Sequence, residues 1–328
     1  MESAWTSSAQ MLVSSSLDEA RAAATSQLRN LPFPSRKIEA WRRTDLSSLA
    51  AARLVPLSQN VADEEGLASA IAEGLDESSS KSRLLLVNGV CDAGRSDLSG
   101  LPDSVAVGSL LSMQPGCDAE TMVQAALRAP LPEQSADART ALGAFTFAAL
   151  NQASLRDVAC VHVPAGVSVD LPIHVFCASS GVVPAASSTD MVAAAPTAMT
   201  ASHPSLFIYV GAGASVRVLQ HFMGVDAYWT NSVTRVFLEK DAVLEHSYIQ
   251  EQSNDAVHID TVQVDVAAGA KYQHALLQSG ARTGRVNLLV NLNGPGAHSA
   301  LRGLTLATGH QLNDVHSSVV HVRSARLN

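Results

Sequence analysis

Apolar and polar residues alternate with a period of two through much of the chain after about Phe145. Val161 and Val163 form one short alternating run, and residues 167–175 form another. Side chains of a β-strand point alternately to opposite faces, so this period is typical of strands with one buried face. The pattern therefore predicts a β-rich second half, from about Leu155 to Val322.

A repeat organises these predicted strands. A small turn residue followed by alanine occurs four times at nearly equal spacing, and the alanines are Ala214, Ala242, Ala270 and Ala297. An apolar alternating run precedes each of these turns. Fixed-period similarity of this kind is typical of a solenoid, in which each coil buries its apolar face against the next. We predict a mainly β fold, a parallel β-helix with a coil of about 28 residues and the four alanines at equivalent corners. An antiparallel sandwich with evenly spaced hairpins is the alternative.

The N-terminal part of the chain, up to about position 140, has a different, mixed character. Residues 16–30 have the composition of a helix and are followed by Leu-Pro-Phe-Pro, whereas residues 83–89 (RLLLVNG) predict a buried strand and a turn. The chain is therefore divided into an N-terminal helical or mixed region, 1–140, and a β-helix core domain, 141–328. The segment 179–202 is rich in Pro, Ala, Ser and Thr without periodicity, which predicts a surface loop.

Charge and composition exclude several classes of protein. The 328 residues carry a net charge of −8 without a basic stripe, which argues against binding to nucleic acid. No apolar run is long enough to cross a membrane, and positions 1–20 hold no Lys or Arg, so we expect a soluble intracellular protein without a membrane partner. The four cysteines form no Cys-x-x-Cys pair, which predicts buried, reduced thiols.

Few residues suggest chemistry. His246 and His274 occupy the same place in successive repeats, and we expect a side-chain ladder, because the sequence singles out no further metal ligands. Cys160 and His162 share a strand face but carry no other sign of a ligand pair. The segment Trp41-Arg42-Arg43 is interpreted as an apolar anchor, Trp41, followed by two solvated arginines. An anion-binding site is the alternative.

Catalytic motifs are missing from the sequence. The glycines of Gly211-Ala212-Gly213 precede no helical pattern, and there is no P-loop lysine, GxSxG or HExxH. We therefore assign no catalytic, cofactor-binding or metal-binding residue and expect a protein that is not an enzyme.

Six segments, in order, carry a family resemblance: PSRKIEAWRRTDLSSL (34–49), LLLVNG (84–89), FAALNQA (147–153), VHVPAGVSVDLPIHVF (161–176), HPSLFIYVGAGASV (203–216) and QLNDVHSSVVH (311–321). Together they resemble the SufD subunit of the SUF iron-sulfur cluster assembly system, a member of the SufB/SufD family. The resemblance implies a right-handed parallel β-helix behind a helical N-terminal region.

The same resemblance implies a scaffold that pairs with SufB and docks the SufC ATPase. A nascent iron-sulfur cluster would form in the full complex, and no cofactor is expected in this chain alone. The compartment would be the bacterial cytoplasm or, in a eukaryote, the plastid stroma.

Two departures from the family pattern stand out. Ser205 follows His203-Pro204 where a basic residue is common, and the chain ends at SARLN, before the Cys-x-His-Gly stretch of the family's cluster site, which would lie beyond Asn328. We therefore expect a fragment or incomplete gene product whose β-helix lacks its C-terminal end. Such a chain is expected to self-associate and to fail to bind SufC.

The alternative function is a carbohydrate-active β-helix enzyme, which would need paired acidic residues on one exposed face. By strand parity Asp260 and Asp265 lie on opposite faces, which disfavours this alternative.

Overall fold

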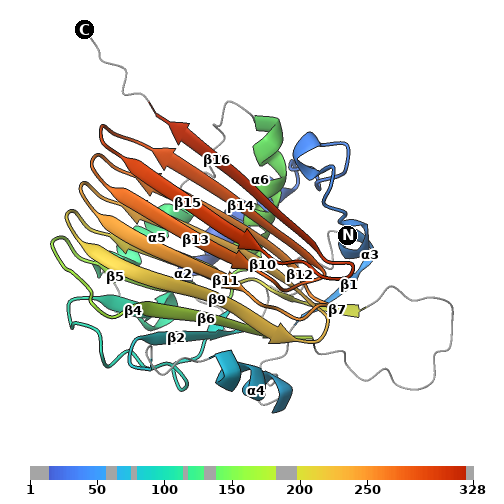
Figure 1. The fold of residues 1–328 in the computed structure, drawn as a ribbon, viewed down its shortest axis with the longest axis horizontal. Helices are drawn as coiled ribbons and strands as arrows, with labels where there is room; N and C mark the ends of the chain where they lie inside the picture. The colour runs from blue at the N-terminus through green and yellow to red at the C-terminus, as the bar shows by residue number, and fades with distance from the viewer. Residues whose placement is uncertain are drawn as a thin grey trace, which may run out of the picture.

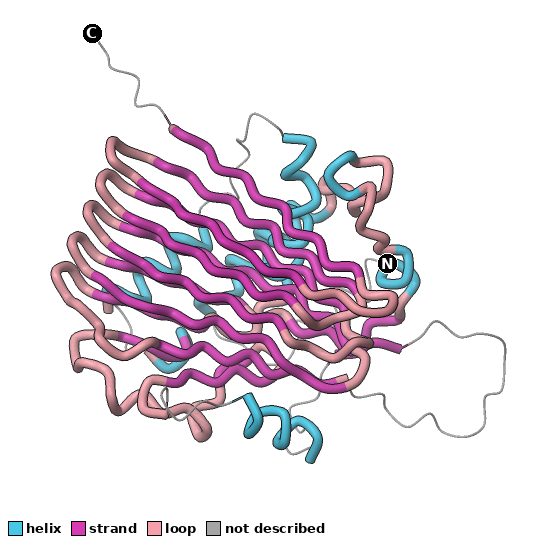
Figure 2. The backbone as a smooth tube through the Cα atoms, viewed as in Figure 1, coloured by secondary structure: helices cyan, strands magenta, loops and turns pink. Residues whose placement is uncertain are grey.

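Parallel strands from successive coils are stacked into two sheets that face each other (Figures 1 and 2). The computed structural model describes residues 15–56, 65–74, 80–113, 117–128, 138–181 and 198–322. Within them the strands of the repeat region pair in parallel, and the chain alternates between the two sheets. The predicted parallel β-solenoid is confirmed, and the antiparallel sandwich is excluded.

The first sheet contains β1 (Arg53–Pro56), β4 (Ala106–Ser109), β5 (Ala159–Val163), β7 (Ala198–Ser202), β8 (Ser205–Val210), β10 (Tyr228–Leu238), β12 (Val257–Val266), β14 (Thr283–Leu292) and β16 (Leu312–His321). The second sheet contains β2 (Arg83–Val87), β3 (Val90–Cys91), β6 (Ile173–Ser180), β9 (Ser215–Val225), β11 (Val243–Gln250), β13 (Lys271–Gln278) and β15 (His298–Thr305). We call them sheet A and sheet B.

The register of the strands reproduces the sequence repeat. In sheet B, Val243 lies opposite Ser215 on one side and Lys271 on the other, and the two steps along the sequence are equal. In sheet A, Val257 lies opposite Thr283, which is a slightly shorter step. The coil length therefore varies a little, and the loops absorb the difference while the strands keep their alignment.

The corners that enter sheet B share one backbone conformation. The residue before each repeat alanine has a positive φ: Gly213 66°, Asp241 58°, Gly269 71° and Gly296 73°. Glycine adopts this conformation without strain, and aspartate tolerates it better than most residues. Ala242 N–H then donates to the carbonyl of Glu239, and the other three alanines make the same bond three positions back. Ala214, Ala242 and Ala270 are fully buried and Ala297 is partly buried, so the predicted equivalence of the four corners is confirmed.

Helices cover part of the outside of both sheets. The helices are α2 (Ser15–Leu28), α3 (Ser47–Ala51), α4 (Glu65–Gly74), α5 (Asp118–Arg128) and α6 (Ala138–Ala153), with 3-10 turns η2 (Glu39–Trp41) and η5 (Leu110–Ser112). Leu17 of α2 and Val123 of α5 pack with Phe207 on the outer face of sheet A, and Phe147 of α6 contacts Trp229 there. Leu67 of α4 packs with Phe176 on sheet B. The helix predicted over 16–30 is confirmed as α2.

The prediction of a loop over 179–202 is wrong at both ends. Ser179 and Ser180 complete β6, and residues 198–202 form β7, which pairs with β1 and β10. The residues of β7 are mostly small, with Met199 as the one large apolar side chain, so the strand shows no apolar alternation in the sequence and is held largely by backbone pairing. Residues 182–197 lie outside the described residues.

The predicted boundary at position 140 is crossed by the sheets. The predicted strand at 83–87 is β2, and it extends sheet B by pairing in parallel with β6, while β4 pairs with β5 at the edge of sheet A. The region 1–140 therefore supplies strands to both sheets. The division into 1–140 and 141–328 stays a prediction.

A buried arginine joins the N-terminal region to the far end of the solenoid. Arg285 of β14 is fully buried, and its Nη1 donates to the carbonyl of Ala40, to Thr44 Oγ1 and to Asp314 Oδ2. Its guanidinium lies 3.8 Å from the ring centroid of Trp41. One cation thus fixes residues 40–44 against β14 and β16.

Replacing Ala242 or Ala270 by leucine should destabilise the protein by about 1–3 kcal/mol, because the extra atoms overpack a corner that is fully buried. Urea unfolding measures the change in free energy. Ala275→Leu is the matched control, since Ala275 is exposed in the middle of β13. Equal stability of the corner variants and the control would contradict the proposed role of the alanines.

Arg285→Met should destabilise the protein by about 1–3 kcal/mol, because it leaves buried acceptors of residues 40–44 without their donor. The rate of backbone amide hydrogen exchange should rise first in residues 38–46, because the contacts of Arg285 with this segment are lost. Arg302→Met, at an exposed position of β15, is the control. Unchanged exchange in 38–46 would show that other contacts hold this segment.

Candidate functional site

Buried polar side chains gather inside the solenoid, between the two sheets. Near the repeat corners the interior is aliphatic, with Leu244 and Val264 fully buried. Farther along the strands the inward positions become polar. The cluster, which we call the interior polar cluster, consists of Gln220, Thr234, His246, Tyr248, His258, Asp260, Tyr272 and His274.

A chain of hydrogen bonds crosses the coils. His246 and His274 lie directly opposite each other on β11 and β13, with ring centroids 5.0 Å apart and planes inclined by 61°. The Tyr272 hydroxyl lies 3.0 Å from Nδ1 of His246 and 3.1 Å from Nδ1 of His274. Nε2 of His246 is 3.2 Å from Gln220 Oε1 and must donate to it. The predicted histidine ladder is therefore confirmed, with edge-on rings bridged by a tyrosine.

A second group links the two sheets. Tyr248 of β11 donates from its hydroxyl to Asp260 Oδ2 of β12 at 2.7 Å. Nε2 of His258 lies 2.6 Å from the same hydroxyl and therefore carries the proton of that bond. Phe222 covers the group, with its ring centroid 4.8 Å from that of His258.

Burial holds the interior histidines neutral. Desolvation lowers the pKa of His274 to about 4 and that of His258 to about 3. It lowers the pKa of His246 well below the usual value, and the neighbouring His274 adds to this effect. Burial has the opposite effect on the carboxyl of Asp260, whose pKa rises to about 6. At neutral pH the cluster therefore holds neutral imidazoles around one carboxylate.

The interior polar cluster is suited to ordering the core. Among the described residues no group of three or more His, Cys, Asp or Glu side chains is placed to hold a metal ion. Nδ1 of His258 and Nε2 of His274 are buried without a hydrogen-bond partner. Of the atoms in the cluster, these two nitrogens are the ones with a lone pair that could bind a metal ion. Asp260 is fully buried inside the solenoid, whereas Asp265 bonds to Asn291 and Asn293 on the outside. These two carboxylates therefore do not form the exposed pair that glycoside cleavage requires.

Cys160, His162 and Trp41, the other residues singled out from the sequence, pack against neighbouring side chains. Cys160 packs with Leu155 and Phe207 beneath the helices, and His162 is stacked on Tyr209 with centroids 5.1 Å apart. Burial raises the pKa of Cys160 to about 12, so its thiol stays protonated. Trp41 is fully buried, whereas Arg42 and Arg43 are exposed, as the anchor interpretation predicts.

The four cysteines differ in burial. Cys160 and Cys177 are buried free thiols, which confirms the prediction for these two. Cys91 and Cys117 are also free thiols but only half-buried, so for them the predicted burial is wrong. Cys91 lies on the edge strand β3, and Cys117 lies just before α5.

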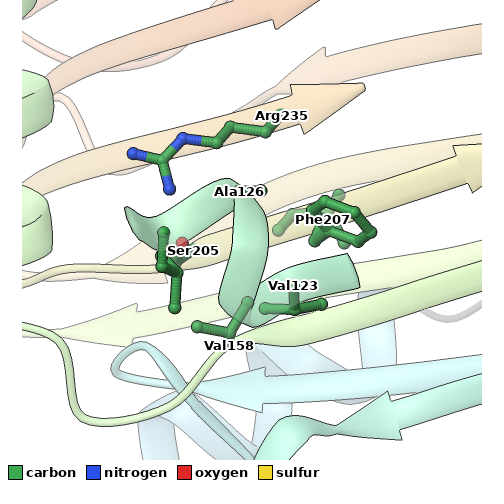
Figure 3. A pocket seen from close by; sticks show the side chains of 8 residues that line it. Val123, Ala126, Val158, Ser205, Phe207 and Arg235 are labelled. Carbon is green, nitrogen blue, oxygen red and sulfur yellow. The ribbon is translucent and has the colours of Figure 1, made fainter. Parts of the chain in front are cut away.

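A narrow depression opens on the outer face of sheet A (Figure 3). The depression has no room for a water molecule. Its lining comes from α5 and the strands beneath: Val123, Ala126, Leu127, Val158, Ser205, Leu206, Phe207 and Arg235. Arg235 was not predicted as a site residue from the sequence. Strand parity does place it on the face of β10 opposite to the inward residues Val236 and Leu238.

Two family models match this chain in consecutive stretches. The model described as SufBD protein N-terminal region matches residues 5–175, and the model described as SUF system FeS cluster assembly, SufBD core domain, matches residues 192–325. The chain belongs to the SufB/SufD family. It is a family of iron-sulfur cluster assembly proteins of the SUF system, as the resemblance of the six segments predicts.

Two curated relatives match most of this chain. The chain is 27% identical over 323 residues to "Protein ABCI7, chloroplastic" of Arabidopsis thaliana, covering 94% of this chain and 60% of the relative. It is 26% identical over 314 residues to "Iron-sulfur cluster assembly SufBD family protein slr0076" of Synechocystis, covering 91% of this chain and 62% of the relative. The chain thus spans about 60% of the length of these two relatives. None of its described helices is long and apolar enough to cross a membrane.

The stability of this SufBD chain should fall as the pH decreases from about 6.5 to 4. An unfolded imidazole binds a proton near pH 6.5, whereas folded His274 does so near pH 4, so acid favours the unfolded state in this window. The loss is about 2 kcal/mol at pH 5 for a group with these two pKa values. Asp260 acts in the opposite direction, because its folded pKa is about 6 and its unfolded pKa is near 4, and it offsets part of the loss.

Urea unfolding at pH 7 and pH 5 measures this dependence. His274→Gln should lose less free energy than the wild type between the two pH values, whereas Asp260→Asn should lose more. His298→Gln, at an exposed position of β15, is the control and should match the wild type. Identical pH dependence in all four proteins would contradict the assignment to the interior polar cluster.

Proposed function

We propose that this protein is a non-catalytic scaffold subunit of an iron-sulfur cluster assembly complex. The observation that carries the proposal is the match of both SufBD models, in order, along one chain. The structure supports it physically. Parallel strands in two long sheets, packed against each other through a mostly aliphatic core and a hydrogen-bonded polar cluster, form a body suited to positioning partners.

The proposed partners are homologues of SufB and of the SufC ATPase. In this assignment the protein pairs with SufB, SufC docks on the pair, and the nascent cluster is cargo of the whole complex. No residue of this chain is assigned as a cluster ligand or a catalytic group. The chloroplastic relative supports the plastid stroma as the compartment in a eukaryote, with the bacterial cytoplasm as its counterpart.

Native co-purification tests this proposal. Antibodies raised against residues 198–322, the repeat region, should capture the endogenous protein together with SufB and SufC homologues, identified by mass spectrometry. Extract from a strain without the gene is the matched control. Depletion of the protein should also lower the activity of iron-sulfur enzymes in the cell.

Two results would overturn the proposed function. One is capture of the protein without SufB or SufC above the level of the control. The other is turnover of a polysaccharide by the purified protein that is lost in Asp260→Asn, since that would favour the carbohydrate-active alternative.

A further inference from the structure

The chain contains two Asn-Gly pairs, and the structure places them in opposite surroundings. Asn88-Gly89 follows β2, and Asn293-Gly294 follows β14. An asparagine before glycine loses its side-chain amide most readily, because glycine has no Cβ to obstruct the approach of its own nitrogen. The reaction still requires the side chain and the backbone to turn toward each other. The surroundings of each pair therefore decide how fast it reacts.

The first pair, Asn88-Gly89, is held in a buried turn. Asn88 is 6% exposed, its Oδ1 accepts from the Ser180 N–H at 3.0 Å, and its own N–H donates to the carbonyl of Ala178 at 2.8 Å. Gly89 lies against the backbone of His203, where a Cβ on the glycine would be 3.0 Å from the carbonyl carbon. Any reaction at this pair requires the turn to open first.

The second pair, Asn293-Gly294, lies at the corner between β14 and β15. Asn293 is exposed, and its side chain makes one hydrogen bond among the described residues, from Nδ2 to Asp265 Oδ1 at 3.0 Å. That bond lies in solvent, so water can replace it at little cost. No hydrogen bond between described residues has the Gly294 N–H as its donor. The amide and the nitrogen that would attack it are thus held far less firmly than at Asn88.

We propose that Asn293-Gly294 is a site of spontaneous deamidation and isoaspartate formation. The Gly294 nitrogen attacks Cγ of Asn293, forms a C–N bond and expels the side-chain NH₂ group, which leaves as ammonia with the proton of the Gly294 N–H. Water then opens the succinimide ring at either carbonyl, which gives aspartate or isoaspartate. Water is the only co-reactant. This modification site is additional to the proposed scaffold function and does not depend on it.

The corner cannot easily accommodate isoaspartate, which adds one methylene group to the main chain. Gly294 is packed closely, since a Cβ on it would lie 2.8 Å from the backbone nitrogen of Ala268. The Gly269 N–H donates to the carbonyl of Pro295 at 3.0 Å, and the Ala297 N–H donates to the carbonyl of Gly294 at 3.2 Å. A longer main chain must displace these contacts. Isoaspartate should therefore loosen the corner that sets the register of β15.

Peptide mapping by mass spectrometry, after incubation of the purified protein at mildly alkaline pH, tests the proposal. Amide loss at Asn293 should be about tenfold or more faster than at Asn88, where two buried hydrogen bonds must open first. In urea the two pairs should react at similar rates, because the fold no longer distinguishes them. An isoaspartate methyltransferase with labelled S-adenosylmethionine should label the incubated wild type. It should not label Asn293→Gln, whose longer side chain closes the ring far more slowly.

Backbone amide hydrogen exchange tests the effect on the corner. Exchange in residues 294–300 should rise in the isoaspartate form. It should stay unchanged in freshly purified Asn293→Asp, which adds the charge without lengthening the main chain. Equal rates at Asn293 and Asn88 in the folded protein, or an intact Asn293 after an incubation that converts the urea-unfolded chain, would overturn the proposed site. Unchanged exchange in the isoaspartate form would overturn the proposed effect on the corner.

Discussion

Every coil of this solenoid must return its strand to the same register as the coil before it. In a parallel stack, a slip of one position would turn the inward side chains outward, so the interior can form only if each coil keeps its alignment. The corner that enters sheet B satisfies this requirement with a positive φ at Gly213, Asp241 or Gly269, followed by a buried alanine. The opposite loops vary in length and absorb the shorter coil between β12 and β14.

The same alignment explains why polar residues can occupy the interior. A side chain on one coil lies over its counterpart on the next, so a buried histidine can be satisfied by inward side chains of the neighbouring coil, such as Tyr272, which lies opposite Leu244. His246 and His274 share the hydroxyl of Tyr272 in this way, and desolvation holds both imidazoles neutral. The cluster therefore contributes directional contacts to a core that is otherwise aliphatic, and it does so without an internal cation at neutral pH.

The periodicity of the sequence could predict the features that recur in every coil, but few of the contacts between the two sheets or with the N-terminal region. The spacing of the alanines gives the coil, its corners and the pairing of His246 with His274. It cannot give contacts between the two sheets, such as Tyr248 with Asp260, because those depend on how the coil closes. Nor can it predict the contact between Arg285 and Trp41, because these two residues are separated by most of the chain. The strand β7 could not be predicted because its mostly small residues show no apolar alternation, and the strand is held by pairing with β1 and β10.

The outer faces of the two sheets place different demands on charge. On sheet B, alternate residues of β11 and β13 are exposed, among them Glu245 and Lys271, and water solvates them. On sheet A, the helices bury the corresponding positions of β10, so any charge there must be met by a partner. Asp314 meets Arg285, whereas Arg235 has an amide in that place. The helices thus make burial on sheet A depend on specific partners such as Asp314 and Gln152, whereas on sheet B water takes that part.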